Sequence, residues 1–380
     1  MLNTDMVLRF LQHTRKSVES ENNIISQNRD ITNIFDSILY SCTKNIDEVS
    51  SPTLIISETY NKYSQLLPVR LKNKVHKYFI LYDCHLQVIM ERFVTIMYSD
   101  EEPAHDVWKL AYELFGEEMI LNENQLLQLY FTLNDIALGP YQISIKENEE
   151  LNLVYQIQKS YVLAHEVGHW LFSMTKEGKE DKILNLSDKV DNITENTREL
   201  LREIYEVFDK QFKDKYYSPL IGEQKRIVYE SDRIVEECFA DSIAYSYIEA
   251  FVKTEYGTKE ARILAVKSLY ILMMSMQILA ISYMTFNNDS FENSTSIRIA
   301  FLRQYLVQYY EDMEKEYYDI IEEIVERFEN RITNIILESF NELEERAMNI
   351  EETIPQGKAL RNIMKELRGL ICDKTSVDVM

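Results

Sequence analysis

Two histidines, His165 and His169, stand four residues apart in the stretch His-Glu-Val-Gly-His. If this stretch is helical, residues four apart lie on one face, so both imidazoles can reach the same metal ion. Zinc binds imidazole nitrogen and prefers four ligands in a tetrahedron, which leaves room for a third protein ligand and a water molecule. Glu166 stands next to this pair, where its carboxylate can accept a proton from that water. The motif therefore predicts a catalytic Zn2+ site with Glu166 as the general base.

A second acidic motif, Glu236-Glu237-Cys-Phe-Ala-Asp241, offers a third ligand. Glu237 can complete a set of two histidines and one carboxylate, which is a known catalytic zinc set. Asp241 is one helical turn further on, shares the face of Glu237 and can accept the N–H of a ligating imidazole, which fixes the ring orientation. Glu236 is the alternative third ligand, but no acidic residue follows it four positions later.

Together, HEVGH at residues 165–169 and ECFAD at residues 237–241 resemble the paired motifs of gluzincin-type zincin metallopeptidases. They are most similar to those of small intracellular bacterial and phage-related zinc peptidases. The resemblance covers roughly residues 140–305 and implies that His165, His169 and Glu237 bind the metal. It also implies that Glu166 is the base, that Asp241 supports the ligands, and that a small sheet beside the motif helix has an edge strand that pairs with substrate.

The sequence departs from this family pattern at one point. Some members carry a His-Pro segment followed by Arg, whereas Ser294-Thr-Ser-Ile-Arg298 matches only the Arg end, which leaves the role of Arg298 open. Peptide hydrolysis also needs a group that stabilises the oxyanion of the transition state. Tyr245, Tyr247 and Arg298 are the candidates for that task.

The two motifs need rigid elements to hold them, and the apolar pattern predicts a helix for each. The first helix runs from Leu151 to Met174, and the second runs from about Arg226 to Glu255 and ends at Gly257. Tyr141–Ile145 alternates apolar and polar residues like a short strand and precedes the motif helix. It is therefore the place where the edge strand is expected.

Only 8 Gly and 6 Pro occur in 380 residues, and long stretches lack helix breakers. The prediction is a mainly α fold of the α+β class, in which a zincin-like core with a small sheet is embedded in helical regions. The helical N-terminal region covers residues 1–138, in which Leu71–Met97 has the pattern of an amphipathic helix. The core covers residues 139–305, with a polar insertion at 176–224, and long acidic helices follow at residues 306–380.

Two apolar stretches lie outside the motifs, and their side chains need other apolar residues to pack against. Residues 268–288 carry no charged side chain and are long enough to span a membrane, but interspersed Ser, Gln, Tyr and Met residues favour a buried helix instead. In the C-terminal helices, apolar residues at intervals of three and four predict packing on the same domain. These residues are Ile321, Val325, Phe328, Ile332, Ile335, Phe340 and Leu343.

The charge balance and the cysteines limit the partners and the compartment. With 41 Lys+Arg against 63 Asp+Glu, the net charge is -22, which argues against binding to nucleic acid. The four cysteines are widely spaced and contain no CxxC pair, and Asp5 and Arg9 stand where a signal peptide needs an apolar run. We therefore expect a cytoplasmic protein. The sequence does not indicate which oligomeric state the protein has.

The leading functional prediction is a zinc-dependent peptidase that hydrolyses a protein or peptide. The alternative is a catalytically idle, zincin-shaped protein that binds a partner through its helical regions, and a third option is hydrolysis of a non-peptide bond. The intact Glu166 favours an enzyme, because a purely structural site has no use for the base. The other histidines are predicted to be structural or exposed: His13, His76, His85 and His105.

Overall fold

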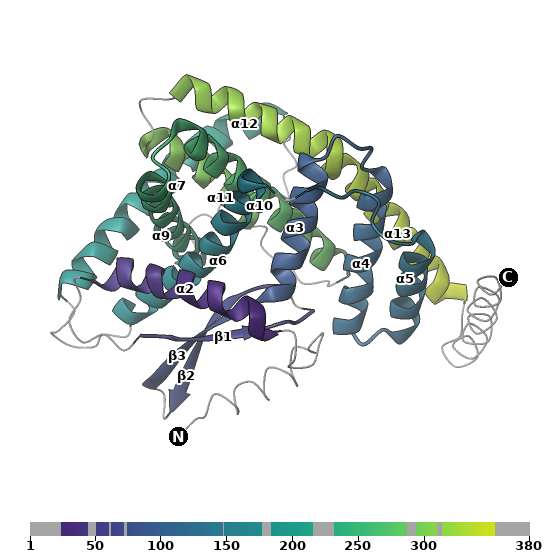
Figure 1. The fold of residues 1–380 in the computed structure, drawn as a ribbon, viewed down its shortest axis with the longest axis horizontal. Coiled ribbons are helices and arrows are strands. Elements are labelled where there is room, and N and C mark those ends of the chain that lie inside the picture. The colour runs from purple at the N-terminus through teal and green to yellow at the C-terminus, as the bar shows by residue number, and fades with distance from the viewer. Residues whose placement is uncertain are drawn as a thin grey trace.

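Helices dominate the structure, and a small mixed sheet lies at one end of it (Figure 1). The computed structural model describes residues 24–44, 51–60, 62–71, 74–146, 148–176, 184–215, 232–286, 294–309 and 314–353. Its helices are α2 (Ile24–Thr43), α3 (Cys84–Tyr98), α4 (Ala104–Leu121), α5 (Gln125–Leu138), α6 (Glu149–Lys176), α7 (Leu184–Lys215), α9 (Asp232–Glu255), α10 (Lys259–Phe286), α11 (Ser294–Tyr309), α12 (Glu314–Phe328) and α13 (Asn334–Thr353). A π-helical turn, η2 (Glu329–Thr333), joins the last two helices. The predicted mainly α (α+β) class is confirmed.

The sheet has three strands in the order β1-β3-β2. They are β1 (Thr53–Ser57), β2 (Gln65–Leu71) and β3 (Lys74–Asp83). β1 pairs with β3 in parallel, and β2 pairs with β3 in the antiparallel direction. β2 is therefore an edge strand, and α6 packs against both β2 and β3.

This sheet lies in the N-terminal region, where the sequence predicted helices, so the prediction of a helix over Leu71–Met97 was wrong for its first part. β3 is buried on both faces: Tyr78 and Ile80 join the main core, whereas Phe79 and Leu81 belong to a smaller cluster on the other face. A strand buried on both faces is a continuous apolar run rather than an alternating one. Periodicity cannot distinguish such a run from a buried helix. The second part of the prediction corresponds to α3.

Tyr141–Ile145 was predicted as the edge strand but forms no strand in the structure. Instead, the backbone N–H groups of Gln142 and Ile143 donate hydrogen bonds to the carboxylate of Asp106, at 2.9 and 2.8 Å. These bonds satisfy the backbone donors that a sheet would otherwise have paired. An alternating pattern over five residues was too short to exclude this arrangement.

Both motif helices are present. α6 contains the predicted helix from Leu151 to Met174, and α9 ends at Glu255, two residues before Gly257, whose φ of 62° suits the end of a helix. Residues 226–231 of the second prediction lie outside the described part of the chain. In the polar insertion, the described residues form α7, which packs along α9.

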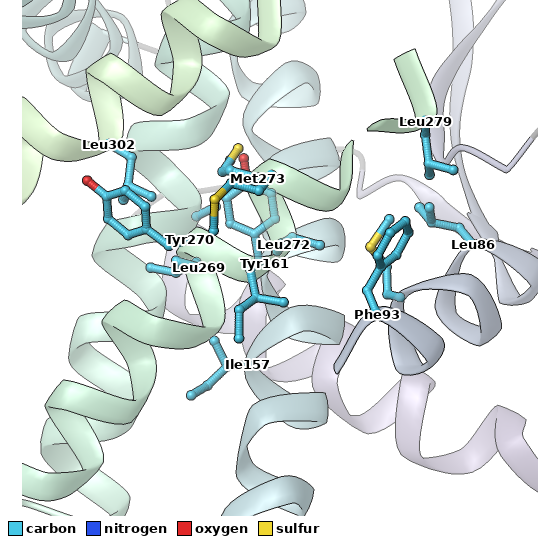
Figure 2. Packing of buried hydrophobic residues seen from close by; sticks show 14 of the residues in the cluster. Leu86, Phe93, Ile157, Tyr161, Leu269, Tyr270, Leu272, Met273, Leu279 and Leu302 are labelled. Carbon is cyan, nitrogen blue, oxygen red and sulfur yellow. The ribbon is translucent and has the colours of Figure 1, made fainter. Parts of the chain in front are cut away.

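One apolar core extends through all three predicted regions, from Ile31 in α2 to Ala347 in α13. α10 contributes many of its side chains, and Figure 2 shows Leu272 and Met273 of this helix close to Tyr161 of α6. The charge-free stretch is therefore a largely buried helix in this structure. By length and composition α10 is also a candidate to cross a membrane, although 72% of its apolar window is buried inside the structure.

The apolar stripe of the C-terminal helices packs on the same core, as predicted. Ile321, Phe328, Ile332, Phe340 and Leu343 are buried in it. The remaining two stripe residues are partly buried against it. The part of the predicted acidic region beyond residue 353 lies outside the described residues.

Candidate metal centre

α6 places both motif histidines on the face that meets α9. The side chain of His165 is buried and that of His169 is half-buried. Their Nε2 atoms face each other at 3.1 Å. As the four-residue spacing predicted, the two imidazoles converge on one point.

α9 brings Glu237 to the same point. Its carboxylate oxygens lie 3.4 Å from Nε2 of His165 and 3.7 Å from Nε2 of His169. One ligand atom from each of the three residues lies within 4.8 Å of the others. The three side chains therefore form a possible metal-binding triad.

The dimensions of this triad fit a zinc ion. Ligand atoms bound tetrahedrally at about 2.0–2.1 Å from zinc are roughly 3.3 Å from one another. The separations of 3.1, 3.4 and 3.7 Å between the two histidines and Glu237 lie around that value. Two imidazoles and one carboxylate are also a donor set that zinc accepts in catalytic sites.

A carboxylate lies behind each histidine. Nδ1 of His165 is 2.9 Å from Asp241, which was predicted for this position, and Nδ1 of His169 is 3.1 Å from Glu236. When Nδ1–H donates to a carboxylate, Nε2 keeps its lone pair free for a metal. Glu236 was considered only as a rival ligand, but the structure places it behind His169 and places Glu237 at the ligand position.

We expect Glu236→Gln to weaken zinc binding about 10–100-fold, because the amide removes the negative charge that supports His169. The measurement is zinc competition against a chelator of known affinity. Glu249→Gln, a change of the same kind on the same helix, is the control and should bind zinc like the wild type. Equal affinity of the Glu236 variant and the control would contradict this role.

Arg298, from α11, contacts the acidic residues of α9 on the side of the site away from the converging Nε2 atoms. Its Nε and Nη2 atoms donate to the two carboxylate oxygens of Asp241 at 2.8 and 2.7 Å, and Nη2 also donates to the hydroxyl of Tyr161 at 2.9 Å. Nη1 lies 3.3 Å from a carboxylate oxygen of Glu237. Because Arg298 is buried among these partners, we assign it to holding the acidic residues in place rather than to stabilising an oxyanion.

The charges of the site follow from these contacts. Burial would raise the pKa of Asp241, but Arg298 and His165 outweigh it and hold the pKa at about 2. Burial would likewise raise the pKa of Glu237, which His165 and Arg298 instead hold well below its ordinary value. For His165, burial and Arg298 lower the pKa, and hydrogen bonds to Asp241 and Glu237 overcome them and raise it to about 9. Both carboxylates are therefore ionised at neutral pH, which favours a bound cation, whereas His165 carries an extra proton in the metal-free site and releases it when Nε2 binds a metal.

Glu166 lies beside the triad and remains available. Its side chain is buried, and its Oε2 atom has no hydrogen-bond partner among the described residues. Burial raises its pKa, an effect that His169, His165 and a hydrogen bond from the backbone of Leu66 partly oppose. A raised pKa suits a carboxylate that accepts a proton and then releases it. Leu66 belongs to the edge strand β2, so this contact joins the predicted base to the sheet.

The two tyrosine candidates differ in position. Tyr245 is buried, its hydroxyl has no hydrogen-bond partner among the described residues, and its ring centroid is 5.7 Å from that of Tyr161. Tyr247 donates a hydrogen bond to Ser37 of α2. Of the two, only Tyr245 lies against a residue that contacts Arg298.

Gly168 allows the two motif helices to approach. A Cβ atom at this position would lie 2.6 Å from the Cα of Ala240 in α9, which is closer than real Cβ atoms come to backbone. The small pair Gly168 and Ala240 therefore permits α9 to bring Glu236 and Glu237 within reach of the histidines.

We expect Gly168→Ala to lower the free energy of unfolding by about 1–3 kcal/mol, because the added methyl group forces α6 and α9 apart. Urea unfolding of the metal-free protein measures this change. Gly116→Ala is the matched control, because a Cβ there would meet its nearest atom at an ordinary 3.6 Å. The control should be neutral or slightly stabilising, since Ala favours helices over Gly. A Gly168 variant as stable as this control would contradict the close-packing argument.

The remaining histidines within the described residues have partners outside the triad. His85 lies 2.7 Å from Glu117, and His105 lies 2.8 Å from Asp106. His13 and the side chain of His76 are outside the described part of the structure. Comparison of the chain with protein-family models, with curated proteins and with solved structures found no match.

Proposed function

We propose that this chain is a zinc-dependent peptidase that cleaves a protein or peptide. The observation that carries the proposal is the convergence of His165, His169 and Glu237, with their ligand atoms within 4.8 Å of one another and Glu166 beside them. A zinc ion bound there would supply a Lewis acid that polarises a scissile carbonyl and makes water more acidic.

The protein groups around the triad support hydrolysis rather than storage of a metal. Glu166 is buried, and one of its carboxylate oxygens has no partner in the part of the chain that the structure describes, so it can accept a proton from the attacking water and pass it to the leaving amine. A site built only to stabilise the fold would gain nothing from an unpaired buried carboxylate, which costs free energy. Asp241 and Glu236 orient the two imidazoles, and Arg298 fixes Asp241.

β2 offers a place for the substrate. It is paired with β3 on one side, and the backbone of Leu66 reaches the carboxylate of Glu166. An extended peptide that added to the side of β2 facing away from β3 would run past the base, with main-chain hydrogen bonds supplying affinity. We therefore assign to β2 the substrate-pairing role that the sequence had placed at Tyr141–Ile145.

Metal analysis combined with a peptide-library cleavage assay tests the proposal. Protein purified without chelators should contain one zinc per chain, and His169→Ala should lose both the metal and the cleavage. His105→Ala is the control, because it removes a histidine outside the triad. Wild-type protein that binds no zinc, or that binds zinc and cleaves nothing in the library, would contradict the proposal; the second result would favour the binding-protein alternative.

A further inference from the structure

α5 has a second apolar face that lies outside the apolar core formed by the described residues. Leu127 and Phe131 are buried, and α4 is the helix that α5 packs against most closely. On the other side of the helix, apolar residues at intervals of three, four and three form a line that we call the α5 stripe. It consists of Leu126, Leu129, Leu133 and Ile136.

The α5 stripe lies at the margin of the molecule. In Figure 1, α3, α4 and α5 stand side by side, with α5 outermost. Ile136 is 62% exposed, and the three leucines of the stripe are half-buried. Full burial of one such side chain gains about 1.5–3 kcal/mol. A line of four on one helix is therefore a surface suited to a helical partner.

The end of the chain supplies a segment with the matching pattern. Residues 354–380 follow α13 and lie outside the described part of the structure. Within them, apolar residues recur at the same intervals of three, four and three, at Leu360, Ile363, Leu367 and Leu370. This spacing predicts an amphipathic helix over residues 358–371, and Pro355 and Gly357 just before it favour a turn.

α13, the helix that precedes the segment in the sequence, packs against α4 and contacts one residue of α5. Arg346 of α13 donates a hydrogen bond to the hydroxyl of Tyr112 in α4, at 3.2 Å, and it also interacts with Tyr130 of α5. Thr353, the last residue of α13, follows seven positions later, or about 10 Å along a helix. α5 has 14 residues, as does the stretch from Lys358 to Ile371, so as helices both are about 21 Å long.

Charge favours the same docking. The whole chain carries a net charge of -22, but residues 358–371 contain one acidic residue, Glu366, and four basic ones. The basic residues form a second line beside the apolar one, at Lys358, Arg361, Lys365 and Arg368. Glu342 and Glu345 lie within one turn of Arg346 on α13, near the place where α13 approaches α5.

We propose that residues 358–371 form a helix whose apolar face docks on the α5 stripe of the same chain. The docking buries both apolar lines and places the basic line toward Glu342 and Glu345 of α13. This inference does not depend on the metal centre or on peptidase activity.

Amide hydrogen exchange of the full-length protein tests the docking. Leu367→Asp should raise the exchange of residues 125–138 about tenfold, although the change lies far from α5 in the sequence. Leu133→Asp should in turn raise the exchange of residues 358–371 by a similar factor. The exchange of α6 should stay unchanged in both variants, which separates release of the segment from global unfolding.

Two control variants add the same charge at positions off the apolar lines. They are Asn362→Asp in the segment and Thr132→Asp, an exposed position on α5, and neither should change exchange in the other element. Exchange of α5 that is the same in Leu367→Asp and Asn362→Asp would overturn the proposal. Protection of α5 that depends on protein concentration, with a doubled mass in sedimentation, would also overturn it, because the occupant would then be a second copy.

Discussion

Replacing Glu166 by Gln should leave zinc binding intact and reduce peptide cleavage by a factor on the order of 10²–10⁴. Glu166 is not one of the three converging ligands, so the amide does not remove a donor from the metal. It does remove the carboxylate that can take a proton beside the triad, and Gln fills nearly the same buried space. The measurement is the turnover number for a library-derived peptide, taken together with the zinc content of the same sample.

Glu150→Gln is the matched control, because Glu150 is an exposed residue at the beginning of the same helix. It should cleave like the wild type. Full activity in the Glu166 variant would exclude Glu166 as the base while leaving the metal centre untouched. Loss of zinc from that variant would instead mean that Glu166 supports the ligands.

The arrangement of the site residues was predictable from sequence wherever it depended on local spacing. His165 and His169 lie on one helix, so their separation of four residues is enough to place both imidazoles together. Glu237 and Asp241 share a face of α9 by the same rule, and the structure brings both to the histidines. The helices themselves followed from apolar periodicity, which is strong in long buried helices.

Contacts between distant elements were not predictable in this way. Glu236 is adjacent to Glu237 but contacts Nδ1 of His169, whereas Glu237 faces the Nε2 atoms of both histidines. This difference depends on how α6 and α9 cross. Arg298 reaches Asp241 from a third helix, far away in the sequence. The only local sign of the close crossing was the small residue Gly168 opposite Ala240, and the pairing of the two appears only in three dimensions.

The sheet was predicted to exist but was assigned to the wrong residues. Pro68 lies inside β2, and a proline in a strand is tolerated mainly at an edge, which is where β2 lies. That residue marked the edge strand, whereas the alternating Tyr141–Ile145 did not. Because β3 is buried on both faces, its sequence does not alternate between apolar and polar residues. Without that alternation β3 was not recognised as a strand, and β2 beside it was missed as well.

Replacing Arg298 by Met should lower the free energy of unfolding of the metal-free protein by about 3–5 kcal/mol, because it removes the guanidinium from the buried carboxylate of Asp241. That carboxylate then keeps His165 and Tyr161 as partners. Asp241 is fully buried, and both of its carboxylate oxygens accept hydrogen bonds from Arg298. Met has a similar length but offers no donor. Arg303→Met, an exposed change on the same helix, is the control and should cost about 1 kcal/mol or less. Urea unfolding at neutral pH measures both.

The pH dependence separates this electrostatic cause from a loss of packing. Burial raises the pKa of Asp241, but Arg298 and, after it, His165 outweigh burial in the wild type and hold the pKa at about 2, below the ordinary 3.8. The stabilisation from this depressed pKa is therefore present above pH 3.8 and is lost as the pH falls toward 2. Without Arg298, His165 alone of these two groups opposes the effect of burial, so the pKa of Asp241 should rise from its wild-type value. The stability difference between the two proteins should then shrink as the pH falls from about 7 to about 4, because Asp241 of the variant takes up a proton.

A second substitution tests the same argument at constant pH. Adding Asp241→Asn to Arg298→Met removes the buried charge, so the double variant should be more stable than Arg298→Met alone. If the double variant is less stable and the loss in Arg298→Met is independent of pH, then packing of the Arg298 side chain holds α11 against the site. If the expected order is found, the ion pair between Arg298 and Asp241 is what allows an acidic residue to lie behind His165 in a buried position.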